Sequence, residues 1–263
     1  MRRLILFPCA GDTLAGTLDE ADGATGLLIV SGGNEIRVGA HRGMAELAAG
    51  LAAEGVPVFR FDRRGIGDSS GKNTGYAASA PDIAAAAATF VAEARVTRLV
   101  AFGNCDAATA LALYHSAAGT DALVLANPWT GDAEDGLPPA AAIRARYAEK
   151  IRDPRAWLRL ARGGVDFGKI AKGLHKVATR PSQSENPLTR ALAAGLAGTR
   201  ATILLAERDN TAIAFRQAWR QVSAPPPVTI LSLDSASHSF ATATDKAWLR
   251  DQVMRAIQRE SAA

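Results

Sequence analysis

Apolar and polar positions alternate in blocks along most of the chain, and these blocks predict strands and helices in turn. Short apolar runs bounded by Gly, Pro, Asn or Asp are typical of strands, whereas longer runs with a helical period are typical of helices. The predicted strands cover residues 4–7, 14–18, 27–30, 56–61, 99–102, 123–125, 202–205 and 228–231. The predicted helices cover residues 44–54, 81–94, 107–116, 212–221 and 245–259. This alternation predicts an α/β fold with a mostly parallel sheet and helices on both faces.

The alternation stops after residues 127–129 and returns near residue 200. The stretch between them has helical segments interrupted by glycines and a proline, and it has no strand-like run. We therefore predict a helical cap over residues 130–195, inserted at the ligand-binding edge of the sheet. Residues 1–129 and 196–263 would then form the core of one catalytic domain, which a chain of 263 residues is long enough to build.

The stretch LVAFGNCDAATALALY, residues 99–114, places a cysteine at the bend between a buried strand and a helix. A nucleophile at such a bend needs very small residues two positions before and after it, because the strand and helix backbones nearly touch. Gly103 and Ala107 meet that requirement. Cys105 would then face the ligand cleft at a helix N-terminus, where the helix dipole favours the thiolate. The alternative is a buried cysteine packed among small residues.

A catalytic acid and base are predicted after later strands. In the chain order nucleophile, acid, base, the acid follows a later strand and the histidine follows the last one. Asp209 lies in the turn after strand 202–205, and His238 lies in the polar loop after strand 228–231. Glu207 is the alternative acid, and a solvated loop histidine is the alternative interpretation of His238.

Two backbone N–H groups are needed to hold an oxyanion during acyl transfer. One is expected from Asp106, the first residue of the helix after Cys105, and the other from the glycine loop at residues 31–34. In that loop either Gly33 or Asn34 is the predicted donor, because glycines let a backbone N–H approach a substrate oxygen closely. An ordinary glycine turn is the alternative.

The stretch FDRRGIGDSSG, residues 61–71, closes the strand before the second predicted helix. We interpret it as structural, with Asp62 and Arg64 bracing the loops below the oxyanion site. A dinucleotide fingerprint is the competing interpretation, but its glycine spacing is off by one and the strand is not the first of a βαβ unit.

These motifs together resemble those of the α/β-hydrolase superfamily. Cys105 stands where the G-x-S-x-G motif of that superfamily has its serine. The narrower stretch VSGGNEIRVG, followed by His41-Arg42 and by GNCDAA, resembles the exosortase A system-associated hydrolases of type 1. That family is found beside bacterial exopolysaccharide and protein-sorting genes, so the resemblance implies an envelope-related role. It does not supply a substrate.

The net charge of +4 is unevenly distributed. Residues 144–200 contain 13 Lys or Arg and 4 Asp or Glu, an excess of 9, so the rest of the chain has a net charge of −5. Such a segment favours an anionic substrate or surface, or else forms a solvated helix face. It has few aromatic residues and no binding motif for nucleic acid, so we expect no nucleic-acid partner.

Other features of the composition limit the location and the cofactors. No apolar run approaches the roughly 18 residues of a transmembrane helix, and the apolar run after Met1-Arg2-Arg3 is too short for a signal peptide. We therefore expect a cytoplasmic protein with free thiols at Cys9 and Cys105. The four histidines and two cysteines show no metal-ligand spacing, so neither a metal nor another cofactor is expected.

The sequence thus predicts a small-molecule acyl hydrolase of the esterase or thioesterase type that forms a thioester on Cys105. An acyltransferase with the same triad, and a non-catalytic binding protein on a hydrolase scaffold, are the two alternatives. The oligomeric state is not predicted.

Overall fold

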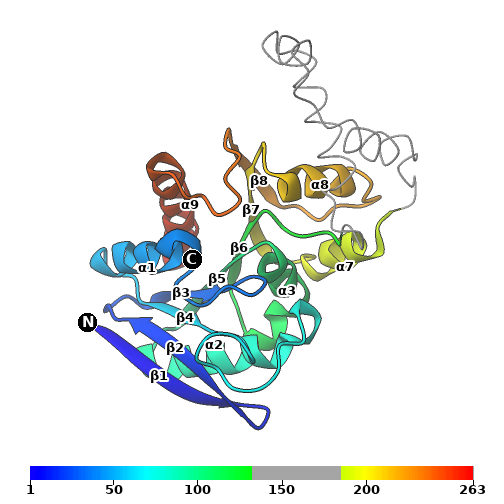
Figure 1. Ribbon diagram of the computed structural model, residues 1–263. Helices are drawn as coiled ribbons and strands as arrows, with labels where there is room; N and C mark the ends of the chain where they lie inside the picture. Colours follow the sequence, from blue (N-terminus) through cyan, green and yellow to red (C-terminus); the bar gives the residue numbers. More distant parts are fainter. Residues whose placement is uncertain (132–184, 263) are drawn as a thin grey trace, which may run out of the picture.

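The computed structural model describes residues 1–131 and 185–262, which build one twisted sheet between two layers of helices (Figure 1). The sheet order is β1-β2-β4-β3-β5-β6-β7-β8. β1 pairs with β2, and β2 with β4, in antiparallel fashion, while all later neighbours are parallel. The strands are β1 (Arg2–Cys9), β2 (Asp12–Asp19), β3 (Thr25–Val30), β4 (Val58–Phe61), β5 (Arg98–Asn104), β6 (Ala122–Ala126), β7 (Arg200–Ala206) and β8 (Thr229–Leu233).

Helices cover both faces of the sheet. One face carries α2 (Ala80–Ala94), α3 (Asp106–Tyr114), α7 (Pro187–Gly195) and α8 (Asn210–Trp219), and the other carries α1 (Gly43–Ala53) and α9 (Ala243–Ser261). Short 3-10 turns occur at η1 (Ala40–Arg42), η2 (Tyr76–Ala78) and η3 (His115–Ala118). The predicted mostly parallel α/β sheet with helices on both faces is confirmed, and the predicted strands and helices agree with the observed ones to within a few residues.

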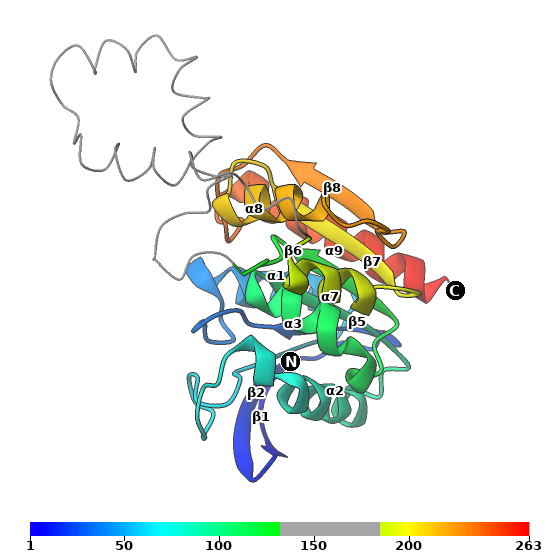
Figure 2. The same cartoon turned by 90° about the vertical axis from the view of Figure 1, so that its right-hand side faces the viewer.

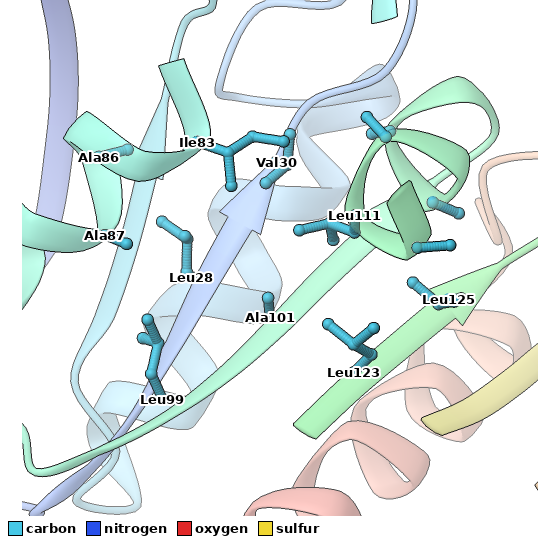
Figure 3. Packing of buried hydrophobic residues seen from close by; sticks show 14 of the residues in the cluster. Leu28, Val30, Ile83, Ala86, Ala87, Leu99, Ala101, Leu111, Leu123 and Leu125 are labelled. Carbon is cyan, nitrogen blue, oxygen red and sulfur yellow. The ribbon is translucent and has the colours of Figure 1, made fainter. Parts of the chain in front are cut away.

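The central parallel strands are buried on both faces, which explains their continuous apolar runs. In β3, Leu28 and Val30 point to the layer of α2 and α3, whereas Leu27 and Ile29 point to the layer of α1 and α9. Figure 3 shows the first layer, in which Leu28 and Val30 lie near Ile83 of α2 and Leu111 of α3. This packing fixes the strand ends from which the candidate site projects.

The end of the predicted cap packs on the core. Helix α7 lies against α3 (Figure 2), and its Leu192 is fully buried in the same apolar cluster as Leu111. Residues 132–184, which make up most of the predicted cap at 130–195, lie outside the described residues. The cap therefore stays a prediction.

The loops that carry the candidate residues all follow the carboxyl ends of strands. β3, β4, β5, β6, β7 and β8 end before Ser31, Asp62, Cys105, Asn127, Glu207 and Asp234, respectively. Because β3 to β8 run parallel, these ends meet at one edge of the sheet, which is where ligands bind in open α/β folds.

Candidate active site

Cys105 lies at the tight bend that joins β5 to α3. Its backbone has φ 61° and ψ −125°, a left-handed conformation that costs a non-glycine residue about 1–3 kcal/mol. The close approach of strand and helix requires Gly103, because a Cβ there would lie 2.8 Å from the carbonyl carbon of Ala107. The bend is held by the Cys105 N–H, which donates to Ala126 O at 3.0 Å. It leaves the thiol partly exposed at the start of a helix.

The structure brings His238 and Asp209 together. His238 Nδ1 lies 3.0 Å from Asp209 Oδ2, and Asp209 is 8% exposed. The same carboxylate caps α8 by accepting from the N–H groups of Thr211 and Ala212, at 3.0 and 3.1 Å. These two hydrogen bonds orient the carboxylate independently of its contact with the imidazole.

Glu207, the alternative acid, is placed elsewhere. Its Oε1 accepts from Arg216 Nη2 at 3.3 Å, and both side chains are exposed. Of the two acids considered from the sequence, the structure therefore places only Asp209 beside His238.

The electrostatics of this group are those of a coupled acid and base. Burial raises the pKa of Asp209, but the hydrogen bond and charge of His238, with the N–H groups of Ala212 and Thr211, outweigh burial and lower it overall. Hydrogen bonds with Asp209 and then with Cys105 raise the pKa of His238 to about 10, against the opposing effect of burial. Because Nδ1 faces Asp209, Nε2 is left for the Cys105 sulfur.

Two asparagines that the sequence analysis did not single out hold the His238 loop. The side-chain amides of Asn104 and Asn127 each donate to His238 O at 3.1 Å. Asn127 is fully buried, has φ 41°, and accepts from Ala206 N at 2.9 Å. Asn127 therefore links three parts of the site: the end of β6, the end of β7 just before Asp209, and the loop that carries His238. The Asn127-Pro128-Trp129 sequence marked only the end of the alternation, and nothing in it indicated a long-range contact.

The glycine loop does not present Gly33 as an open donor. The Gly33 N–H donates to Asp106 Oδ1 at 2.5 Å, and Arg63 Nη2 bridges Gly33 O at 2.7 Å and Asp106 Oδ2 at 3.2 Å. A substrate oxyanion would have to displace the Asp106 carboxylate to bind the Gly33 N–H, and the choice between Gly33 and Asn34 as donor stays a prediction. Asn34 is the other predicted donor in this loop, and its N–H forms no hydrogen bond with the Asp106 carboxylate.

Of the two residues expected to brace the loops below the oxyanion site, Asp62 holds the loop that follows β3, whereas Arg64 does not. Buried Asp62 accepts from the N–H groups of Arg37 and Asp68 and forms an ion pair with the Arg37 guanidinium. Arg64 instead pairs with Asp82 of α2, with Nε 2.6 Å from Oδ1. The arginine below the oxyanion loop is Arg63, so the expected bracing role belongs to Arg63 and not to Arg64.

Another histidine, His115 of η3, lies away from this edge. Its Nε2 is 2.9 Å from Gly195 O, at the end of α7. Within residues 1–131 and 185–262, no group of three or more His, Cys, Asp or Glu side chains could hold a metal ion. No helix in the same part of the chain is long and apolar enough to cross a membrane.

Comparison with known proteins agrees with this geometry. Residues 27–251 match the model of the alpha/beta hydrolase family. The chain belongs to the alpha/beta hydrolase family and is a hydrolase of that type. A search of curated protein sequences finds no significant match.

Solved structures of similar fold cover the whole chain. The alpha/beta hydrolase GrgF from Penicillium sp. sh18 is 16% identical with a TM-score of 0.67, and 100% of each chain is covered. DcsB, solved with its substrate analogue, is 15% identical with the same TM-score and coverage. The Pyrococcus furiosus esterase Pf2001 is 17% identical with a TM-score of 0.63, covering 99% of this chain and 92% of the esterase. At these identities the likeness concerns the fold.

Proposed function

We propose that this hydrolase cleaves esters or thioesters through a Cys105, His238 and Asp209 triad. The observation that carries the proposal is the 3.0 Å contact between Asp209 Oδ2 and His238 Nδ1. It is supported by the strained strand-to-helix bend at Cys105 and by the effect of Cys105 on the pKa of His238. Strain of this kind at a cleft is typical of functional residues, since packing alone does not require a left-handed cysteine. The alpha/beta hydrolase family and the esterase fold neighbour give independent support for this class of reaction.

In the first half of the reaction, the Cys105 sulfur attacks the acyl carbonyl and forms a C–S bond. The proton of the thiol passes to His238 and from there to the leaving alkoxide or thiolate as the acyl bond breaks. Asp209 keeps Nδ1–H directed at its own Oδ2 and stabilises the imidazolium. In the second half, water gives a proton to His238, attacks the thioester, and releases the acid and the Cys105 thiolate.

The oxyanion is held by the Asp106 N–H and, in this proposal, the Asn34 N–H. The first-turn N–H groups of α3 have no partner within the helix, so the Asp106 N–H is suited to this role. Losing one oxyanion donor typically raises the barrier by about 3 kcal/mol. Gly33 could replace Asn34 only after the Asp106 carboxylate moves away.

The substrate class follows from the chemistry of sulfur. A thiolate attacks well but also leaves well, so thioesters, lactones and aryl esters suit it better than unactivated amides. The anionic substrate expected from residues 144–200 stays a hypothesis, because most of that segment lies outside the described residues. The cytoplasmic location and the envelope-related role implied by the exosortase resemblance are hypotheses too.

Cys9 provides a matched control for the test. Burial and the nearby Asp82 raise the pKa of Cys9 to about 11, so this thiol is unreactive near neutral pH. We expect Cys105→Ala to abolish turnover of p-nitrophenyl esters and Cys9→Ala to retain it. Mass spectrometry of the acylated protein should place the acyl group on Cys105 alone.

Equal turnover by wild type and Cys105→Ala would contradict the proposal, whereas no turnover by either protein would favour a binding protein on this scaffold. Acyl products that appear with added alcohols or amines, at the expense of the free acid, would identify an acyltransferase instead.

A further inference from the structure

Two aromatic side chains, Tyr76 of η2 and Trp129 in the loop after β6, meet beside the candidate nucleophile and take no part in the mechanism above. Their ring centroids are 5.3 Å apart and their planes are inclined at 69°, so the edge of one ring meets the face of the other. Both side chains are half-buried, so part of each ring stays accessible. We call this pair of rings, Tyr76 and Trp129, the aromatic corner.

The backbone of Trp129 is fixed to the bend that carries the nucleophile. Its N–H donates to Cys105 O at 3.2 Å, and its carbonyl accepts from Thr109 Oγ1 of α3 at 2.6 Å. The indole therefore projects from a backbone position that contacts Cys105 directly. Because both bonds use the main chain of Trp129, a change of its side chain leaves them in place.

The turn that carries Tyr76 is tied to the oxyanion side of the site. Ser79 Oγ donates to Tyr76 O at 2.6 Å and accepts from Arg63 Nη1 at 3.2 Å. Arg63 is the side chain that also bridges the glycine loop and Asp106. Burial, and after it Tyr114 and Asp106, raise the pKa of Tyr76, which agrees with a phenol near the first turn of α3. The two rings are thus held from both neighbours of the nucleophile bend.

The two helical layers decide which part of a substrate meets the aromatic corner. Tyr76 packs on the apolar layer of α2 and α3, whereas Phe240, two residues after His238, belongs to the layer of α1 and α9. In the proposed reaction His238 protonates the leaving group, so the leaving group lies on the His238 side of the sulfur. The acyl group is the part of the substrate left for the other side, where Tyr76 and Trp129 lie.

We propose that the aromatic corner binds a flat aromatic ring in the acyl group of the substrate, an inference that rests on the proposed acyl hydrolysis. A flat ring can stack on the face of one aromatic side chain while its edge meets the face of the other, and aromatic pairs prefer these two arrangements. A cyclohexyl ring of equal carbon number also buries apolar area, but it is thicker and lacks the ring quadrupole. It therefore gains less from the corner.

The test uses thioesters that share the leaving group N-acetylcysteamine, which has no ring. Phenylacetyl is compared with cyclohexylacetyl, and 4-phenylbutanoyl with 4-cyclohexylbutanoyl, so that two chain lengths are sampled. We expect Tyr76→Leu and Trp129→Leu each to lower the aromatic-to-cyclohexyl ratio of kcat/KM by about two- to tenfold for at least one length, the range typical of one aromatic pair.

Two further variants serve as controls. Tyr76→Phe keeps the ring and should retain the wild-type ratio. Trp219→Leu should retain it too, because Trp219 also has an aromatic partner at 5.3 Å, Phe215, but is the last residue of α8, at the end opposite Asp209.

The ratio separates a substrate subsite from a structural role, because loss of folded protein lowers both rates equally. With Cys105-dependent turnover intact, an unchanged ratio in either leucine variant, or the same fall in Trp219→Leu, would overturn the subsite and leave the proposed hydrolysis standing. If Trp129→Leu does not fold, Tyr76→Leu decides the result alone.

If no thioester turns over in a Cys105-dependent way, the proposed hydrolysis fails. Saturation-transfer NMR then decides the subsite, with the uncharged probes phenylacetamide and cyclohexylacetamide. A preference for phenylacetamide that Tyr76→Leu reduces and Trp219→Leu retains supports it. Equal binding or no binding of the two probes, or a preference that Tyr76→Leu leaves unchanged, overturns it.

Discussion

The two sides of the candidate site are built differently. On the acid–base side, Asp209, Asn127 and the His238 loop come from three strand ends and are joined by hydrogen bonds in which Asp209 and Asn127 are buried. On the oxyanion side, Gly33 and Asn34 are exposed, and the loop is held chiefly by the Asp106 carboxylate and Arg63. We infer that the base is fixed before substrate binds, whereas the oxyanion loop is held by a contact that competes with substrate.

The largest effect on activity is expected on the acid–base side, from Asp209→Asn. Asparagine also caps helices well, so α8 should keep its cap, but the imidazolium loses the charge that stabilises it. We expect kcat/KM for an activated ester to fall by about 10³-fold or more. Stopped-flow or steady-state assays measure this loss. Glu207→Gln is the control, and we expect it to behave as wild type. A similar loss in both variants would show that the acid is misassigned.

Asn127→Gly should have the next largest effect. Glycine tolerates φ 41°, so this variant removes the side-chain amide without adding backbone strain. The His238 loop then loses one of its two amide donors, and we expect kcat/KM to fall by about 10- to 100-fold through misplacement of the base.

A positioning role for Asn127 has its own signature in the pH profile. If His238 is displaced from Asp209, the upper limit of the kcat/KM profile should move from near pH 10 toward the ordinary value of 6.5 for histidine. A variant that loses stability but keeps the wild-type upper limit would assign Asn127 a structural role only.

On the other side of the site, Asp106→Ala tests the contact that holds the oxyanion loop. The change removes the acceptor of the Gly33 N–H and one partner of Arg63. We expect the free energy of unfolding to fall by about 1–2 kcal/mol. Hydrogen exchange should accelerate at residues 33–36 and stay unchanged in the His238 loop. Faster exchange in both regions would show that the two sides are not independent.

The same contrast explains what could be predicted from the sequence. The strand-to-helix bend at Cys105 and the positions of Asp209 and His238 follow local rules of spacing and chain order, so they were recognisable. The contact of Asp106 with Gly33 joins residues 73 positions apart. The bonds from Asn104 and Asn127 to His238 O span 134 and 111 positions. No local pattern encodes such partners, since they depend on the order of strands in the sheet.

Arg63 shows the same limit at shorter range. Arg63 and Arg64 are neighbours in one motif, and the motif predicts a bracing role for Arg64. Which of two adjacent side chains faces the site depends on the path of the chain after β4, and there Arg64 turns to Asp82 of α2 while Arg63 turns to Gly33.

The smallest expected effect is the pH dependence of stability that His238 contributes. The pKa of His238 is about 10 in the folded protein and near 6.5 when unfolded. Its stabilising contribution is therefore complete below pH 6.5 and is lost as the pH rises from there to about 10. Because the imidazole is partly exposed, solvent screens its interaction with Asp209, and we expect a modest change in the free energy of unfolding. Denaturant unfolding of wild type and His238→Gln at several pH values measures it. The stability difference between them should shrink between pH 6.5 and 10, and a difference that grows over this range would mean that the folded protein keeps His238 neutral.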